Sequence, residues 1–457
     1  MKSRATVLLV VICLARLLSA QANPVPLISQ PLVPDATAPG SGPFQLTVSG
    51  AGFVPGSVVR WNGTSLSTSF LSSDKLRATI PGPLVARKGT ASISVANPRP
   101  GGGVSNVAYF TVRSKSTTVA ATRTDYAIDP SPQALAVADV NRDGKLDVIV
   151  AETGSDTVSV LLGNGDGTFK APADYATDSQ PQVPIMGDFN HDGKLDLAVP
   201  CYGSNTVSVL LGNGDGTFQA AVSYPTGISP AFGIAADLNR DGNLDIVTVN
   251  QGTGTISVLL GSRNGTFLGN VDYAVDANPD WVDAGDFDSN GTLDLAVSNF
   301  DSGTVSVLSG NGDGTFQPET SYLVQGGPGS VTAADLNGDG RLDLVVANQL
   351  SNNISVLLGK GPGTFAPPVD YLVSGNANRA MVADLNGDNK PDVVVLTGSP
   401  SVDILLGNGN GTFGSPLSFS TGNCPFAIVA ADFNRDGHLD LVDVNACDGT
   451  ISVLLAK

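Results

Sequence analysis

One aspartate-rich nonapeptide recurs along most of the chain, and its spacing constrains the fold more than any other feature. The first copy, 139–147, reads D-V-N-R-D-G-K-L-D. Six later copies follow at steps of 49 residues, with 48 for the last step, and they begin at Asp188, Asp237, Asp286, Asp335, Asp384 and Asp432. A fixed period of this length predicts a repeat architecture in which each unit buries apolar surface against its neighbours.

Four short β-strands are predicted in each repeat. Around the first copy they cover 133–138, 147–152, 157–162 and 168–176, and they are rich in apolar and β-branched residues. Clusters of Gly, Asn and Asp separate them, as tight hairpin turns require. A period near 49 residues with four antiparallel strands is typical of a propeller blade, so the seven copies predict seven blades.

The two ends of the repeat region are expected to share one blade. The seventh repeat stops after a third strand near Leu455, and the segment 118–128 precedes the first repeat without a nonapeptide of its own. The D-Y-A run at 125–127 matches the ends of other fourth strands, such as 174–176. We therefore expect 118–128 to complete the last blade and to remove the open edges of the array.

The repeats resemble a known family. The nonapeptide, and the V-S-V-L-L-G-N-G-D-G-T-F run that accompanies it at 158–169, are similar to those of FG-GAP/VCBS repeat propellers. The relatives of that family include the integrin alpha-subunit heads. The resemblance covers about residues 117–457 and implies an all-β fold, a seven-bladed β-propeller of four-stranded blades. It also implies a function in adhesion, carbohydrate binding or, less often, catalysis.

Two further segments precede the repeats. Residues 1–22 combine Lys2 and Arg4 with an apolar stretch and a small-residue cleavage site, which predicts a secretory signal peptide. Residues 23–113 alternate strands with Gly and Pro turns, and this pattern predicts an Ig-like β-sandwich that resembles the IPT/TIG family and holds Trp61 in its core. The predicted location is therefore secreted, extracellular or at the cell surface, with the periplasm as an alternative.

The acidic residues predict metal sites. The chain carries a net charge of −18, and all of its acids except Glu152 and Glu319 are aspartate. Calcium takes about six to eight oxygen ligands, and the short Asp and Asn side chains at positions 1, 3, 5 and 9 of each loop can converge on one ion. We predict about seven structural Ca²⁺ ions. Their ligands are Asp139, Asn141, Asp143, Asp147, Asp188, Asn190, Asp192, Asp196, Asp237, Asn239, Asp241, Asp245, Asp286, Asp288, Asn290, Asp294, Asp335, Asn337, Asp339, Asp343, Asp384, Asn386, Asp388, Asp392, Asp432, Asn434, Asp436 and Asp440.

Two of the loops depart from the pattern. The fourth exchanges its third and fifth positions, with Asp288 before Asn290, and keeps three carboxylates. The sixth has Asn389 where the other loops have Gly, and we expect its site to be the weakest. The acidic charge excludes a nucleic-acid partner. No stretch after the signal is apolar enough to span a membrane, and the protein is predicted to be monomeric.

The cysteines predict one disulfide. Hairpin register in the last blade places Cys424 opposite Cys447, and a secreted chain allows the bond to form. Cys201 is left over and is interpreted as a small buried residue. The only two histidines, His191 and His438, lie inside the acidic loops. Because no catalytic arrangement can be built away from those loops, we expect no enzymatic activity; a carbohydrate-active enzyme such as a polysaccharide lyase is the alternative.

A ligand site is predicted near the central channel of the propeller, at the rim opposite the acidic loops. The position five residues before each loop varies among the repeats, and three of its residues are large or charged. The candidate ligand residues are Tyr202, Phe232, Trp281, Asp283 and Arg379. Exposed aromatic and charged groups favour an adhesion or ligand-recognition module for an extracellular protein or polysaccharide. The alternative is that Phe232 and Trp281 merely fill the channel.

Overall fold

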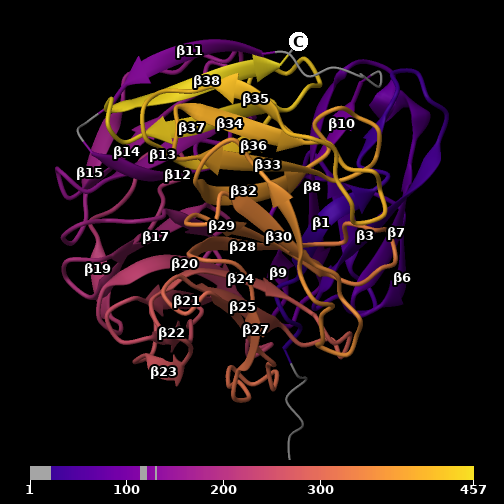
Figure 1. Ribbon diagram of the computed structural model, residues 1–457. Coiled ribbons are helices and arrows are strands. Elements are labelled where there is room, and N and C mark those ends of the chain that lie inside the picture. The colour runs from indigo at the N-terminus through magenta and orange to yellow at the C-terminus, as the bar shows by residue number, and fades with distance from the viewer. Residues whose placement is uncertain (1–21, 114–120, 129–130, 457) are drawn as a thin grey trace, which may run out of the picture.

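The computed structural model describes residues 22–113, 121–128 and 131–456 (Figure 1). Within these ranges the protein is all-β, with one 3-10 turn, η1 (Gly82–Val85), and no α-helix. Nearly all of the predicted signal peptide, residues 1–21, lies outside the described residues. No helix in the described ranges could cross a membrane.

Seven four-stranded antiparallel sheets follow one another from residue 121 to residue 456. In the first six sheets the strands pair in chain order, as short hairpins dictate, and in the last sheet β11 takes the place of a fourth strand. The sheets are β12 (Pro132–Ala138), β13 (Asp147–Glu152), β14 (Thr157–Leu161), β15 (Ala173–Ala176); β16 (Ile185–Gly187), β17 (Asp196–Cys201), β18 (Thr206–Leu210), β19 (Val222–Pro225); β20 (Pro230–Ala236), β21 (Asp245–Asn250), β22 (Thr255–Leu259), β23 (Val271–Ala274); β24 (Pro279–Gly285), β25 (Asp294–Asn299), β26 (Thr304–Leu308), β27 (Thr320–Leu323); β28 (Pro328–Ala334), β29 (Asp343–Asn348), β30 (Asn353–Leu357), β31 (Val369–Leu372); β32 (Ala377–Ala383), β33 (Asp392–Thr397), β34 (Ser401–Leu405), β35 (Leu417–Ser420); and β36 (Pro425–Ala431), β37 (Asp440–Asn445), β38 (Thr450–Ala456), β11 (Ala121–Ala127).

The first strands of the seven sheets form a closed inner ring. Each contacts the first strand of the next sheet, and β36 of the last sheet contacts β12 of the first. The two ends of the repeat region meet in that last sheet, where β11 pairs antiparallel with β38 and Tyr126 lies opposite Ile451. Figure 1 shows the magenta β11 beside the yellow β38. The array of sheets therefore has no free edge at the junction of its two ends.

Burial explains why the second strand of each sheet is so apolar. Every residue of β13 and of its six counterparts is buried, because each sheet is covered on both faces by its neighbours. The fourth strands are mostly exposed and shorter than expected: β15 begins at Ala173, whereas a strand was predicted from residue 168. Phe169 makes only an isolated bridge with Gly163, and its ring packs against Tyr126 and Phe433 of the closing sheet.

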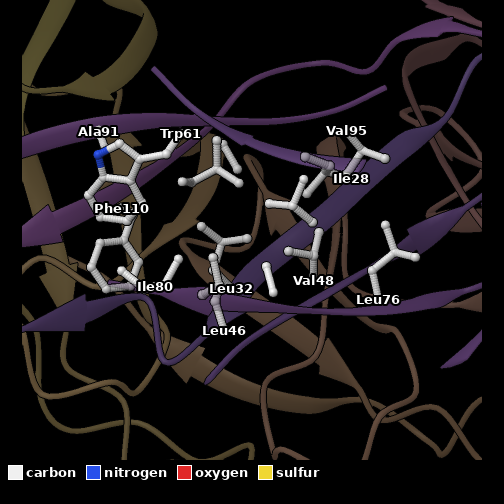
Figure 2. Close-up of a cluster of buried hydrophobic side chains, with 14 of the residues drawn as sticks. Ile28, Leu32, Leu46, Val48, Trp61, Leu76, Ile80, Ala91, Val95 and Phe110 are labelled. Atoms are coloured by element: carbon white, nitrogen blue, oxygen red, sulfur yellow. The ribbon is translucent and has the colours of Figure 1, made fainter. Parts of the chain in front are cut away.

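The N-terminal residues form two further sheets that pack face to face. Their shared core contains Trp61, whose ring lies 5.3 Å from that of Phe110, together with aliphatic side chains from both sheets (Figure 2). One sheet has the order β1 (Leu27–Val33), β3 (Phe44–Ala51), β7 (Lys75–Ile80), β6 (Thr68–Ser72); the other has β2 (Ala36–Thr37), β10 (Ala108–Val112), β8 (Gly89–Asn97), β4 (Val58–Trp61), β5 (Thr64–Ser65), with β9 (Gly103–Val104) beside β8.

The N-terminal sheets lie against the inner ring. β1 contacts β28 and β32, and Tyr109 of β10 packs against the hydrophobic clusters of the last two sheets. Figure 1 shows the indigo strands along one side of the repeat region. This contact occurs at the end of the first strands that carries the acidic loops.

Candidate functional site

The acidic loops connect the first and second strands of the sheets, and their side chains organise their own backbone. In the first loop, Asp139 accepts hydrogen bonds from the N–H groups of Asp143 (3.1 Å) and Gly144 (2.8 Å). Asn141 accepts a second bond from the N–H of Asp143, at 2.9 Å. Gly144 has a φ of 80°, which a residue without a Cβ adopts freely. The loop therefore turns its oxygens inward.

The ninth position of each loop is a fully buried aspartate that joins two turns. Asp147 accepts hydrogen bonds from the N–H of Val140 at 3.0 Å and from that of Gly163 at 2.8 Å. Burial raises its pKa to about 6, and the neighbouring carboxylates of Asp139 and Asp143 add to the rise. The same causes raise the pKa of Asp245 to about 8. Desolvation is the larger cause of both shifts, and a cation bound at the loop would oppose it.

Only the fourth loop brings three carboxylates close together among the described residues. Ligand oxygens of Asp286, Asp288 and Asp294 lie within 4.8 Å of one another. The donors of all seven loops are oxygen atoms, which suits a hard cation such as calcium. Of the seven predicted calcium sites, the structure therefore shows a carboxylate cluster at one. The other six loops, each with Asn at position 3, belong to the proposed function below.

A second candidate site lies at the other end of the first strands. A cavity of about 150 Å³ is lined by four of the five candidate ligand residues, namely Tyr202, Phe232, Trp281 and Arg379. The first strand of each sheet runs from this cavity to its acidic loop, so the two sites occupy opposite ends of the inner ring. Sequence reasoning missed the polar neighbours that complete the lining, Gln133, Gln182, Gln251 and Asp280. These residues lie at the start of the first strand of a sheet or directly after the second strand. That shared position in the repeat could have identified them in the sequence.

The aromatic groups of this cavity stack on one another. The rings of Phe232 and Trp281 lie 3.5 Å apart and nearly parallel, and the Arg379 guanidinium lies 4.8 Å from the Trp281 ring centre. Arg379 also pairs with Asp280 at 2.9 Å, and Asp280 accepts a hydrogen bond from Gln251 at 2.8 Å. The stack and the polar side chains line the same cavity.

Asp283 does not line this cavity. Its two carboxylate oxygens accept hydrogen bonds from the N–H groups of Ala284 and Ala333, both at 2.9 Å. Desolvation raises its pKa to about 6. Because Ala333 belongs to β28, Asp283 ties two adjacent first strands together, and its assignment as a ligand residue is corrected to a structural one.

The cysteines and histidines occupy the places that the sequence suggested. Cys424 and Cys447 form a disulfide with Cα atoms 5.4 Å apart. Cys201 is free and buried, and burial raises the pKa of its thiol to about 11. His191 lies within hydrogen-bond distance of Asn243, at 3.1 Å, and His438 lies 3.3 Å from Arg113. These contacts keep both imidazoles at the loop end, away from the cavity.

Comparison with known proteins yields one family match. The model of the FG-GAP-like repeat matches six consecutive and overlapping segments, 139–199, 188–248, 237–297, 286–346, 335–395 and 384–442. No curated protein matches the chain. No matching family model covers the N-terminal sheets, so their predicted IPT/TIG relationship gains no support from this comparison.

Solved structures of similar fold share little sequence with this chain. BBS1N in complex with ARL6DN has a TM-score of 0.54 at 11% identity, and the match covers 75% of this chain and 98% of that one. The periplasmic gluconolactonase of Pseudomonas aeruginosa has a TM-score of 0.49 at 17% identity, over 74% of this chain and 93% of that one. An auxiliary nutrient binding protein from Bacteroides ovatus has a TM-score of 0.43 at 12% identity, and the match covers 95% of this chain and 98% of that one.

The expectation that the protein has no enzymatic activity is corrected by this result. Among the matching structures is one described as a gluconolactonase, at 17% identity. The lack of a histidine- or cysteine-based arrangement does not exclude a reaction, because other side chains, such as Tyr or Lys, also act as acids and bases. The likeness concerns the fold and assigns no reaction to this chain.

Proposed function

Because the chain belongs to the FG-GAP-like repeat family, we propose that residues 117–457 form a seven-bladed, calcium-stabilised propeller that recognises an extracellular ligand at its channel mouth. Residues 1–22 act as its secretory signal, and residues 23–113 as an Ig-like module of the IPT/TIG kind. The Cys424–Cys447 disulfide supports an oxidising location, outside the cell or in the periplasm.

Calcium occupies the seven acidic loops in this proposal. The support comes from the all-oxygen donor set, from the carboxylate cluster of the fourth loop and from the raised pKa values of the buried ninth-position aspartates. The residues that hold the ions are those at positions 1, 3, 5 and 9 of each loop. The ions neutralise the carboxylates and fix the turns between first and second strands.

The single observation that carries the recognition function is the cavity beside the Phe232–Trp281 stack. Tyr202 and three glutamines supply hydroxyl and amide groups to a cavity that Phe232 and Trp281 also line, and this mixture suits the alternating polar and apolar surface of a sugar. Within the described residues, every hydrogen bond that Arg379 donates comes from Nη1. Its Nε and Nη2 groups therefore remain available to a ligand oxygen. We assign the end of a polysaccharide chain as the ligand.

The cavity volume limits how much of a ligand can enter. About 150 Å³ is below the range of roughly 300–1,000 Å³ that is usual for small-molecule sites. One sugar ring at a chain end is therefore a better fit than an internal segment of the polymer. The remaining sugars would lie across the outer surface of the sheets.

Binding to a glycan array in calcium, with Tyr202→Ala beside the unaltered chain, tests this function. We expect Tyr202→Ala to lose at least about tenfold in affinity with an unchanged melting temperature, because the Tyr202 side chain lines the cavity and is partly exposed. Tyr202→Phe, which keeps the ring, is the matched control for the hydroxyl. Any bound glycan is also assayed for cleavage.

Trp281→Ala gives a different expectation. Its ring is stacked between partners, so both binding and melting temperature should fall. Recognition of arrayed peptides in place of glycans, or glycan binding that is indifferent to Tyr202, would overturn the assignment.

A further inference from the structure

The cavity beside the Phe232–Trp281 stack is lined by an ion pair that joins two sheets which are not neighbours. Arg379 of β32 donates from Nη1 to Oδ2 of Asp280 in β24, at 2.9 Å. The strand β28 lies between them and contacts both. At Gly329 of β28, an added Cβ would lie 3.2 Å from that Nη1 and 3.6 Å from that Oδ2. A side chain at this position would therefore crowd the ion pair, and glycine leaves room for it.

The guanidinium of Arg379 is held in place from several directions. Its central carbon lies 4.8 Å from the ring centre of Trp281 and 5.3 Å from that of Phe426. Nη1 also donates to the carbonyl oxygens of Gly329 and Asn378. The two side chains of the ion pair are only 14% and 15% exposed. The pair is therefore a fixed and largely desolvated part of the site.

The charges of the cavity lining already balance. Of the described residues that line it, Asp280 and Arg379 are the charged ones, and their charges cancel. A carboxylate on a ligand would be a second negative charge beside one guanidinium, in a place largely removed from water, which is unfavourable. A hydroxyl group brings no such charge. The net charge of −18 on the whole chain also repels a polyanion at longer range.

The hydrogen-bonding groups of the lining favour hydroxyl groups as well. The side-chain amide of Gln251 donates to Asp280 at 2.8 Å, and that of Gln182 donates to the carbonyl of Gln180 at 3.1 Å. Within the part of the chain that the structure describes, neither amide oxygen accepts a hydrogen bond, so both remain for a donor on the ligand. The Tyr202 hydroxyl can donate or accept. A sugar hydroxyl donates and accepts, whereas a carboxylate only accepts.

We propose that this cavity selects uncharged sugars and that Asp280 is the residue that excludes acidic ones. The inference rests on the proposed recognition of a polysaccharide end and names its class, a neutral hexose in preference to a uronate. Asp280 acts by occupying Nη1 of Arg379 and by cancelling its charge. The guanidinium then donates to a neutral oxygen and does not serve as a free fork for a carboxylate.

Paired oligosaccharides that differ only in the terminal sugar test the proposal: glucose against glucuronate, galactose against galacturonate, and mannose against mannuronate. For the full-length protein in calcium, we expect the neutral member of the bound pair to bind at least about tenfold more tightly. Asp280→Asn should reduce this preference by about tenfold, because it leaves the charge of Arg379 uncompensated. Asp301→Asn removes the same charge in the exposed turn between β25 and β26, outside the lining, and should leave the preference unchanged.

A second variant keeps the ion pair intact. Gln182→Lys adds a cation to the lining and should likewise shift the preference toward the uronate, and melting temperatures show whether each variant is folded. Equal binding of both members by the unaltered protein, or tighter binding of the uronate, would overturn this inference and leave the proposed recognition of glycans standing. A folded Asp280→Asn variant that keeps the full preference would overturn the role of Asp280. If no oligosaccharide binds, the proposed function fails, and this inference fails with it.

Discussion

At the scale of single residues, the loops depend on aspartates that fold their own backbone and remain short of positive charge. Each ninth-position carboxylate is fully buried and already accepts two N–H bonds, as Asp245 does from Leu238 and Gly261. Burial raises the pKa of such a group, and a nearby cation would lower it again. The loop is therefore both a turn and an incomplete coordination shell, and its protonation should compete with metal binding.

This competition predicts an unusual pH dependence for the metal-free protein. The pKa of Asp245 is about 8 when folded and near 3.8 ordinarily, so the folded state holds its proton more tightly. Stability in EDTA should consequently be greatest at low pH within the folded range and should fall as the pH rises from about 5 to about 8. Calcium should abolish this fall by replacing the proton. Thermal melting across that range checks the expectation, and a rise in the EDTA melting temperature toward pH 8 would contradict it.

At the scale of elements, one aromatic contact of the same kind joins neighbouring sheets at six of the seven junctions. The tyrosine of a fourth strand meets the phenylalanine of the following G-T-F run edge-on, with ring centres 5.3–5.5 Å apart. The two motifs that recur in the sequence are therefore the two sides of one interface. Edge-to-face pairs add about 0.5–1.5 kcal/mol beyond the area that they bury.

Phe316 offers a direct test of this interface. It is 8% exposed and meets Tyr273 at 5.5 Å. Phe316→Ala should lower the free energy of unfolding by about 3–5 kcal/mol, because it leaves a cavity between two sheets. Val271→Ala, at a residue 53% exposed on the same fourth strand as Tyr273, is the control and should change little. Urea unfolding measures both, and equal effects would refute the interface argument.

At the scale of the whole molecule, the ring depends on its loops as well as on its closing strand. Arg142 of the first loop donates to the Gly193 carbonyl of the second, and Arg435 of the seventh donates to that of Gly144 in the first. These two contacts join the seventh, first and second loops, and the third and sixth loops contact the N-terminal module. Their order should be required for the stability of the entire chain.

Removal of calcium should therefore destabilise the protein globally. At about 1 mM calcium and a dissociation constant of about 0.1 mM, each site contributes about 1.4 kcal/mol. Seven such sites approach the net stability of a whole domain, about 10 kcal/mol. Excess EDTA should lower the melting temperature by many degrees, and added calcium should restore it. An unchanged melting curve would remove the basis of the calcium proposal.

Much of this organisation could be predicted from the sequence because the same pattern of strands and turns recurs seven times. Period, hairpin turns and apolar alternation are local properties, so the strands, the order of each sheet and the pairing of 121–127 with the last strand follow from them. The Cys424–Cys447 pair follows from hairpin register in the same way. Residues that break the repeat, such as Asn389, were visible but their purpose was not.

The sequence by itself determined the four-stranded repeats and their acidic loops, whereas the tertiary structure decided which distant residues each repeat contacts. Asp283 was grouped with Trp281 by position, yet its half-buried carboxylate accepts the N–H of Ala333 in the next first strand, because a carboxylate removed from water requires hydrogen-bond donors. Asp35 lies 349 positions before Asp384 and carries no motif, and only the docking of the N-terminal sheets brings the two together. Contacts between distant segments depend on how modules pack, and no local pattern encodes that geometry.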